Sequence, residues 1–378
     1  MARALAKAGL LAAVLAFATA SAYSQAIVRA PQSVTAPQQA AIDQARNVAA
    51  TLLREKNLPG LSIAVGVDGK LVWKEGFGWS NVEQRVPVSP GTRFRIGSVS
   101  KLLASVAVGV LYEEGRIQLD APVQTYIPDF PKKKWPITTR ELMAHTSGIR
   151  HYERDEALSN KPYASLKDGL VIFDRDPLLF KPGTQVHYSS YAWNLVGAIV
   201  AKISGEPFYT FVRDRITAPI GMLDTTADFV KPIISDRVAY YDHTEDGKLE
   251  NSPAVDESYK WSSGGYLSTP SDLVRFGYAV LHDRVLAAKT REMLWAPVKL
   301  EDGTPTGRGL DWRLDVDADG RKVVSHNGGS VGGSTRLAIY PEQDMVIAVT
   351  SNVSGAGKDV EGLTDALAHI FGGNGKLD

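Results

Sequence analysis

Residues 97–111 read GSVSKLLASVAVGVL, and a single charged residue, Lys101, stands among apolar and small ones. Nearly every position from Leu102 to Leu111 is apolar or small, which predicts a helix that is buried on most of its sides. The positions three and four residues away from Lys101 carry no carboxylate that could neutralise its charge. The nearest functional group is the hydroxyl of Ser98, one helical turn back on the same face.

The pair of Ser98 and Lys101 has two interpretations. A lysine that is desolvated without a counter-ion has a lowered pKa, and its neutral amine can take a proton from a nearby hydroxyl. In that case Ser98 is a nucleophile, and its N–H at the start of the helix can stabilise an oxyanion. Alternatively, Ser98 caps the helix and Lys101 extends its amine to solvent. These residues alone leave both interpretations open.

The two ends of the chain mirror each other. Near the front, a helical pattern over residues 38–57 precedes LSIAVGV and KLVWKEGFGW, which flank Asp68-Gly69 and predict a hairpin. Near the back, TRLAIYP and MVIAVTSN are followed by the helical DVEGLTDALAHIF. We expect the two ends to share one antiparallel sheet with helices packed on it.

The region between these ends has a different pattern. Helical stretches broken by proline and glycine, such as 97–114, 136–145 and 190–204, predict a mainly helical insertion at 91–299. Residues 38–90 and 300–375 would then form an α/β domain, an antiparallel β-sheet flanked by helices. The sequence contains no internal repeat that would suggest a solenoid.

The first residues predict export. Arg3 and Lys7 precede an apolar run that ends in Ala20-Ser21-Ala22, the pattern of a signal peptide over residues 1–22 with cleavage after Ala22. The apolar run is short for a membrane anchor, so we expect a periplasmic or secreted protein without a stable anchor after cleavage.

Composition narrows the class of protein. The chain has 378 residues, a formal net charge of +0 and no cysteine. The absence of cysteine excludes disulfides, thiol catalysis and a cysteine-linked lipid anchor. The balanced charge implies no nucleic-acid partner. The oligomeric state cannot be read from these features.

A second stretch with functional side chains is FKPGTQVHYSSYAWNLVGAIVAKISG, in which Tyr188-Ser189-Ser190 precedes an apolar helix. If Tyr188 lies beside a cationic lysine, its pKa is lowered and it can relay protons. The alternative is a tyrosine of the hydrophobic core.

A third stretch is VVSHNGGSVGGSTRLAIYP, which predicts a short strand ending in His326, followed by glycines and another strand. The glycines would let a substrate approach the backbone, and the N–H of Gly329 could be a second oxyanion donor. The alternative is a structural histidine near a turn.

Taken in order, Ser98-Val99-Ser100-Lys101, Tyr188-Ser189-Ser190 and His326-Asn327-Gly328 resemble the three motifs of the serine β-lactamase-like family. This family contains class C β-lactamases, D,D-peptidases, D-aminopeptidases and family VIII esterases. The likeness extends over about residues 40 to 370, with supporting stretches such as ITTRELMAHTSGI and SSGGYLSTPSDLVRF. It implies an α/β domain and a helical domain with the active site between them.

The resemblance also implies roles for individual residues. Ser98 would be the acylated nucleophile, Lys101 its base, Tyr188 the proton shuttle and His326 the third-motif residue. The oxyanion would lie between the N–H groups of Ser98 and Gly329. Ser190, Asn327 and Gly328 would contact the substrate, and no cofactor or metal is implied.

Two positions depart from the pattern of many relatives. Ser190 stands where they have an asparagine that holds the substrate's acylamino group, and His326 stands where class C β-lactamases have a lysine. Both changes argue against a dedicated β-lactamase. The histidine form of the third motif is more similar to certain D,D-peptidases and the mitochondrial-type branch. We therefore expect an exported serine hydrolase acting through an acyl-enzyme on a peptide or a peptide-like amide. The alternatives are a carboxylesterase, a β-lactamase of weak or narrow activity, or a catalytically silent binding protein.

Two further motifs are set aside. Asp315, Asp317, Asp319 and Gly320 have the spacing of an EF-hand loop, but His326 stands where the loop requires a bidentate glutamate. Asp319-Gly320 instead predicts a hairpin turn. His145 in AHTSG has no carboxylate partner in its motif and is interpreted as a residue that fixes its loop.

Overall fold

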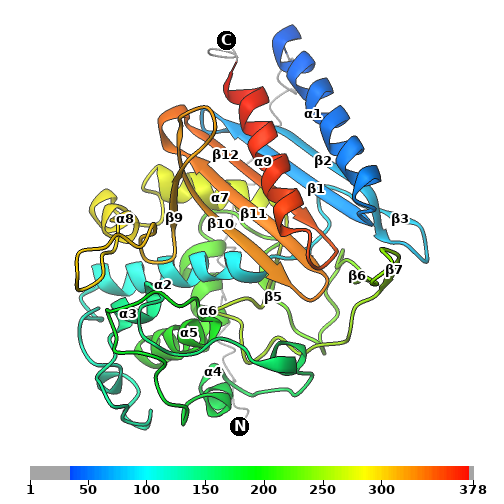
Figure 1. The fold of residues 1–378 in the computed structure, drawn as a ribbon. Helices are drawn as coiled ribbons and strands as arrows, with labels where there is room; N and C mark the ends of the chain where they lie inside the picture. Colours follow the sequence, from blue (N-terminus) through cyan, green and yellow to red (C-terminus); the bar gives the residue numbers. More distant parts are fainter. Residues whose placement is uncertain (1–34, 374–378) are drawn as a thin grey trace, which may run out of the picture.

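The computed structural model describes residues 35–373, which form a large sheet with helices on both faces and a mainly helical region beside it (Figure 1). The seven-stranded sheet has the order β3-β2-β1-β12-β11-β10-β9, and its neighbouring strands are antiparallel. Its strands are β1 (Gly60–Val67), β2 (Lys70–Asn81), β3 (Val86–Pro87), β9 (Arg313–Val316), β10 (Lys322–Ser330), β11 (Gly333–Tyr340) and β12 (Met345–Ser351). The predicted fold class is confirmed.

The two ends of the chain meet at the centre of this sheet. Strand β1 pairs with β12, and Ile63 lies opposite Val349 in the register. The hairpin between β1 and β2 turns at Asp68 and Gly69, which have φ angles of 50° and 72°. Asp-Gly favours such a turn because both residues tolerate positive φ. The predicted sharing of one sheet by the two ends is therefore confirmed.

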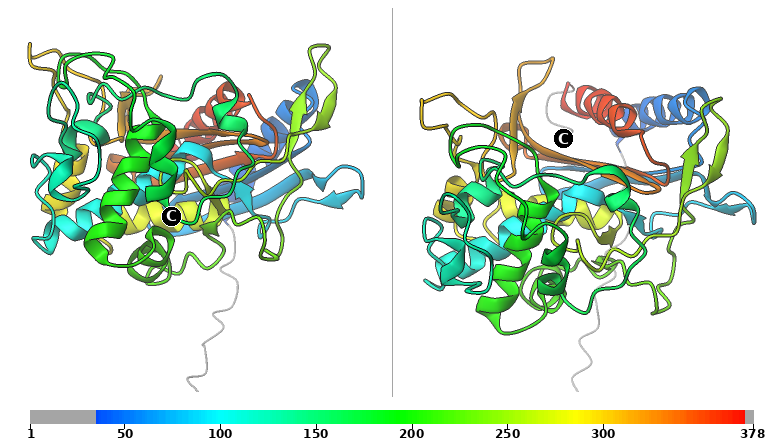
Figure 2. Two further views of the ribbon diagram at one scale, coloured as in Figure 1. Left: turned by 90° about the horizontal axis from the view of Figure 1, so that it is seen from below. Right: turned by 60° about the horizontal axis from the view of Figure 1, so that its bottom comes forward.

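Helices cover both faces of the sheet (Figure 2). α1 (Ala36–Glu55) and α9 (Gly357–Gly372) pack on one face, and α7 (Pro270–Leu281) packs on the other. α1 begins at a capping box in which Thr35 and Gln38 satisfy each other's backbone N–H groups. Apolar residues of β1, β12 and α9, among them Ile63, Ile347 and Leu367, form the core beneath α1 and α9.

The region between β3 and β9 is mainly helical. Its longest helices are α2 (Ser100–Glu113) and α5 (Ser190–Ser204), which pack against each other. The shorter helices are α3 (Thr139–Met143), α4 (Leu166–Gly169), α6 (Phe208–Val212) and α8 (Ala288–Trp295). Small sheets are formed by β4 (Phe94–Arg95), β8 (Tyr266–Ser268) and β5 (Thr226–Ala227), and by β6 (Tyr241–His243) and β7 (Leu249–Asn251). Single turns of 3₁₀ helix occur at Val123–Thr125, Arg154–Leu158, Leu170–Ile172 and Pro341–Gln343, and a π turn occurs at Arg213–Thr217.

Helix α2 lies in the core of this region. Every residue from Ser100 to Leu111 is buried, as the sequence predicted. A 3₁₀ turn, Gly97–Val99, precedes it and carries Ser98. The predicted helix at 136–145 is shorter than expected, because Thr138 caps α3 at its start and His145, with a φ of 61°, turns the chain after it.

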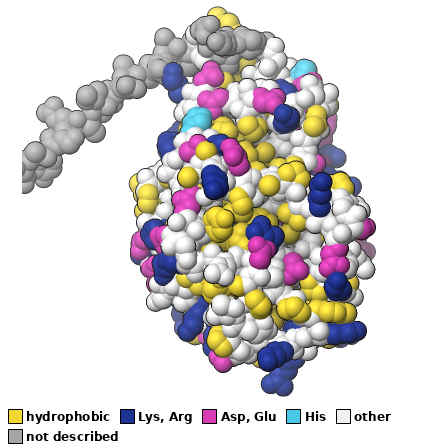
Figure 3. Space-filling model, turned by 90° about the vertical axis from the view of Figure 1, so that its left-hand side faces the viewer, with side chains coloured by type: hydrophobic (Ala, Val, Ile, Leu, Met, Phe, Trp, Pro, Cys, Tyr) yellow, Lys and Arg dark blue, Asp and Glu magenta, His cyan; other side chains and the backbone are white. Residues whose placement is uncertain are grey.

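On the face of the molecule drawn in Figure 3, basic and acidic side chains alternate around patches of apolar ones. This face therefore carries no field of a single sign. Among residues 35–373, no single helix meets the length and hydropathy needed to cross a membrane. α5 and the segment Phe208–Thr217 meet the criterion only together, and they are bent by 78° relative to each other. The predicted signal peptide lies outside the described residues.

Candidate active site

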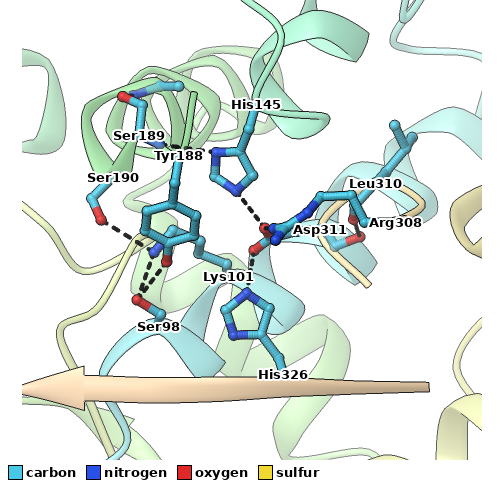
Figure 4. Close-up of polar contacts among 12 residues, drawn as sticks. Ser98, Lys101, His145, Tyr188, Ser189, Ser190, Arg308, Leu310, Asp311 and His326 are labelled. Atoms are coloured by element: carbon cyan, nitrogen blue, oxygen red, sulfur yellow. Dashed lines mark hydrogen bonds and ion pairs between the residues drawn. The ribbon is translucent and has the colours of Figure 1, made fainter. Parts of the chain in front are cut away.

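Ser98 and Lys101 lie together at the start of α2 (Figure 4). The Nζ of Lys101 is 2.9 Å from the Oγ of Ser98. Ser98 makes no capping hydrogen bond with its side chain, and Lys101 is completely buried. The alternative interpretation, a capping serine with a lysine extended to solvent, is therefore wrong.

The amine of Lys101 is held by oxygen atoms of three segments. Besides Ser98, it lies 3.3 Å from the Oγ of Ser190 and 2.5 Å from the carbonyl oxygen of Ser263. No carboxylate oxygen is among these contacts. Burial lowers the pKa of Lys101 to about 7, although Asp311 acts in the opposite direction. Near neutral pH a large fraction of the amine is thus uncharged and can accept a proton.

Tyr188 reaches Ser98 from the segment before α5. Its hydroxyl lies 2.7 Å from the Oγ of Ser98, and Lys101 Nζ is 4.9 Å from the centre of its ring. Burial, followed by the charge of Asp311, raises the pKa of Tyr188 above its usual value. The predicted lowering of this pKa by Lys101 is wrong, because desolvation of the phenolate outweighs the lysine. Tyr188 is therefore a neutral phenol beside Ser98.

A cleft of about 370 Å³ opens over Ser98. Ser190, Gly329 and Lys260 lie in its wall, together with Tyr152, His151 and Ser263. A cavity of about 690 Å³ lies elsewhere in the helical region, lined by residues that include Leu166, Phe208 and Trp261. We place the site in the smaller cleft because Ser98 lies in its wall, within hydrogen-bond distance of Lys101.

The backbone of β10 lies directly against the turn that carries Ser98. A Cβ atom on Gly328 would lie 2.0 Å from the carbonyl oxygen of Ile96, and one on Gly97 would lie 2.5 Å from that of Gly329. Gly97 also has a φ of 49°, which favours glycine. Glycine at these positions lets the two segments meet, and it brings Gly329 to the cleft wall with Ser98. Gly328 thus serves close packing and is absent from the residues that line the cleft.

The third predicted motif is divided between two faces of the sheet. Strand β10 does not end at His326 but continues to Ser330. Since residues of a strand alternate in direction, the side chain of Asn327 points away from the cleft, and it contacts Glu361 and Arg336. The expectation that Asn327 contacts substrate through its side chain is corrected accordingly. His326 is buried, and its Nε2 lies 3.2 Å from Asp311.

Asp311 was not predicted from the sequence. It is completely buried, and its Oδ1 lies 2.5 Å from the Nε2 of His145 (Figure 4). The prediction that His145 has no carboxylate partner is therefore wrong. The ring of His145 also lies 4.4 Å from that of Tyr188, and its Nδ1 accepts the N–H of Ser189. An aspartate in GLDW belongs to no motif, so only the fold reveals this contact.

The charges around the cleft follow from these contacts. Burial lowers the pKa values of His145 and His151 to about 4, so both are neutral at pH 7. Burial by itself would raise the pKa of Asp311, but the two adjacent histidines outweigh it and hold this pKa well below its usual range. Asp311 is thus an anion behind the site. No group of three or more metal-ligating side chains in the described part of the chain could hold a metal ion.

Comparison with known proteins identifies the family of this chain. Residues 45–370 match the family described as Beta-lactamase. The chain is 32% identical to the human serine beta-lactamase-like protein LACTB, mitochondrial, over 80% of this chain and 72% of that protein. It is 24% identical to penicillin-binding protein 4* of Bacillus subtilis, over 85% of this chain and 74% of that protein.

Solved structures share the fold. The octameric penicillin-binding protein homologue from Pyrococcus abyssi is 26% identical and superposes with a TM-score of 0.76, covering 88% of this chain and 77% of that one. A D-amino acid amidase from Ochrobactrum anthropi, 22% identical, also gives a TM-score of 0.76, over 88% of this chain and 100% of that one. With the family match over most of its length, the chain belongs to the beta-lactamase family of serine hydrolases.

Proposed function

We propose that the protein hydrolyses a peptide or a peptide-like amide through an acyl-enzyme on Ser98. The observation that carries this proposal is the position of the Ser98 Oγ, 2.9 Å from an amine and 2.7 Å from a phenol. Burial lowers the pKa of that amine to about 7. A hydroxyl beside a neutral amine is the arrangement that activates a serine nucleophile.

In the first half of the reaction, the Oγ of Ser98 attacks the carbonyl carbon of the substrate. Its proton passes to the neutral amine of Lys101, and the carbonyl oxygen takes the negative charge. The N–H groups of Ser98 and Gly329 would stabilise this oxyanion from the cleft wall. When the intermediate collapses, the C–N bond breaks and the leaving amine takes a proton from the Tyr188 hydroxyl. The proton on Lys101 then replaces the one that Tyr188 gave, so Tyr188 is again a phenol and Lys101 is again a neutral amine.

In the second half, water attacks the acyl carbon, and its proton passes to the neutral amine of Lys101. The bond between the carbonyl carbon and the Oγ of Ser98 breaks, and the Oγ takes that proton from Lys101. The enzyme returns to its starting state and the carboxylic acid leaves. Two relatives are named as penicillin-binding proteins, which supports acylation of Ser98 by an amide carbonyl.

A carboxylesterase is the second candidate, and one observation favours it. No asparagine or glutamine is among the residues that line the cleft, and the hydroxyl of Ser190 faces Lys101. Without an amide donor at this wall, an acylamino group of a peptide loses a hydrogen bond worth about 1–3 kcal/mol. A small ester needs no such bond. A third candidate is a β-lactamase of weak or narrow activity, which the comparison of substrates below also tests.

The experiment compares three substrates on the purified protein without residues 1–22. These are a D-Ala-D-Ala peptide, p-nitrophenyl butyrate and nitrocefin, each also tested with the Ser98→Ala variant. The proposal expects the highest kcat/KM for the peptide and loss of turnover in the variant. A highest value for the ester would establish the second candidate, and turnover of none of the three would support a silent binding protein.

We also propose that the protein is exported and acts in the periplasm or outside the cell. The proposal rests on the basic and apolar pattern of residues 1–22. N-terminal sequencing of the protein recovered from a periplasmic extract should begin at Tyr23. Recovery of the intact chain from the cytoplasm would contradict export.

A further inference from the structure

Asp311 and His145, which contact each other in the core, both have strained backbones. Their φ angles are 73° and 61°, in the left-handed region that residues with a Cβ atom seldom adopt. Both side chains are completely buried, and their contact joins segments 166 residues apart. Strain of this kind persists where surrounding contacts fix it, and it concentrates at functional sites.

The hydrogen bonds of His145 determine its tautomer. Its Nδ1 lies 3.1 Å from the backbone nitrogen of Ser189, which has a hydrogen to donate. Nδ1 must therefore carry the lone pair, and Nε2 carries the hydrogen. Nε2 donates this hydrogen to the Oδ1 of Asp311 at 2.5 Å. His145 is thus a neutral imidazole with its hydrogen on Nε2.

The contact of His326 with Asp311 is of a different kind. Its Nδ1 donates to the carbonyl oxygen of Asn327 at 2.6 Å, because a carbonyl oxygen can only accept. Its Nε2 lies 3.2 Å from the Oδ2 of Asp311, but neither of these two atoms makes a hydrogen bond. Of the two histidines, His145 is therefore the one that donates a hydrogen bond to Asp311.

We infer that Asp311 is a positioning residue of the active site, which holds His145 as its Nε2–H tautomer behind Tyr188. The inference deepens the proposed function and rests on it. Asp311 contacts neither Ser98 nor the cleft and acts through His145. It fixes Tyr188 through the ring of His145, which lies 4.4 Å from the Tyr188 ring at 32°. Figure 4 shows His145 and His326 on opposite sides of Asp311, with Tyr188 beside His145.

Asp311 also acts on Lys101 through its charge. The charged groups that act on Lys101 are Asp311, Lys260 and Arg308, and neutral Tyr188, His145 and His151 surround it as well. Asp311 is the one carboxylate that opposes the effect of burial on the pKa of Lys101. Removing its charge should therefore move this pKa below about 7.

The test uses Asp311→Asn, which keeps the shape of the side chain. An asparagine offers one carbonyl oxygen and one NH₂ group in place of two acceptor oxygens, so it removes the negative charge beside His145. The charge that opposes the effect of burial on the pKa of Lys101 is then lost. The matched control is Asp315→Asn, four residues further along the chain, where the half-exposed carboxylate pairs with Arg313.

The first measurement is nitrogen NMR of the full folded chain with ¹⁵N-labelled histidine at pH 8. The wild type should contain a neutral imidazole with its hydrogen on Nε2, assigned to His145 by its loss in His145→Gln. This state should persist in Asp315→Asn. A wild-type His145 with its hydrogen on Nδ1, or with both nitrogens protonated, would overturn the inference, and this result needs neither activity nor folding of the Asp311 variant.

The second measurement is the rate of acylation by a fluorophosphonate between pH 5 and pH 9. In Asp311→Asn the maximum rate should fall at least tenfold, and the acidic limb should move to lower pH. Asp315→Asn should match the wild type. If the acidic limb of the pH–rate profile did not move in a folded Asp311→Asn variant, the inference would be contradicted. If the wild type itself is not labelled at Ser98, the proposed function fails, whereas the NMR result still decides the tautomer of His145.

Discussion

The amine of Lys101 and the hydroxyl of Ser98 face each other at 2.9 Å where the turn Gly97–Val99 leads into α2, a helix that is buried from Ser100 to Leu111. Burial disfavours the charged form of Lys101 and lowers its pKa to about 7. The same burial therefore supplies a base that works near neutral pH.

The pH dependence of acylation should follow Lys101. Because the neutral amine is the reactive form, the rate should rise with pH and level off above about 7. Well below this pH, the rate should fall about tenfold for each unit. Lys101→Arg should lose activity by about 10²-fold or more at every pH, because arginine stays protonated. An active Arg variant, or a rate independent of pH between 5 and 8, would contradict the role of Lys101.

Removing the phenolic oxygen of Tyr188 should reduce turnover without unfolding the protein. Tyr188→Phe keeps the ring against His145 and removes the hydroxyl that lies 2.7 Å from Ser98. We expect kcat to fall by about 10²- to 10⁴-fold, the range of general acid–base catalysis. Steady-state kinetics and the thermal midpoint would be measured together. An unchanged kcat would mean that Tyr188 is only a core residue.

The two neighbouring glycines of β10 should respond differently to alanine. A Cβ on Gly328 would lie 2.0 Å from the carbonyl oxygen of Ile96, whereas one on Gly329 would meet nothing within 4 Å. Gly328→Ala should lower the free energy of unfolding by about 1–3 kcal/mol. Gly329→Ala is the control and should change it by less than about 0.5 kcal/mol. If chemical denaturation gave equal losses of unfolding free energy for the two variants, β10 would not approach the backbone of Ile96 closely at Gly328.

A buried ion pair should hold the far wall of the cleft. Arg95 pairs with Asp228 at 2.7 Å, with both side chains buried, and donates to the carbonyl oxygen of Val331 at the cleft wall. Asp228→Asn should cost about 3–5 kcal/mol, because it leaves a buried guanidinium without its counter-ion. Asp224→Asn breaks a comparable pair with Arg93 whose carboxylate is 43% exposed. That control should cost at most about 1 kcal/mol.

Local patterns in the sequence were sufficient to predict much of the fold. Asp68-Gly69 between two alternating segments predicted the first hairpin, and the apolar run after Lys101 predicted a buried helix. Short-range chemistry of this kind is encoded in a few adjacent residues. The contact between Ser98 and Lys101 could be predicted for the same reason, since the two residues are three positions apart in the sequence.

Contacts between segments that are far apart in the sequence could not be predicted from local patterns. Asp311 meets His145 across 166 positions, and no spacing in either segment indicates the other. The pKa of Tyr188 was predicted in the wrong direction because its burial depends on the packing of several segments. The direction of Asn327 could not be predicted while β10 was expected to end at His326.

The central claim is that Ser98 is the nucleophile, and intact-mass spectrometry after treatment with a fluorophosphonate tests it most directly. The wild type should gain the mass of one phosphonyl group, located at Ser98 by peptide mapping, and Ser98→Ala should gain none. An equal mass gain in wild type and Ser98→Ala, or no gain in a folded wild-type protein, would contradict the account.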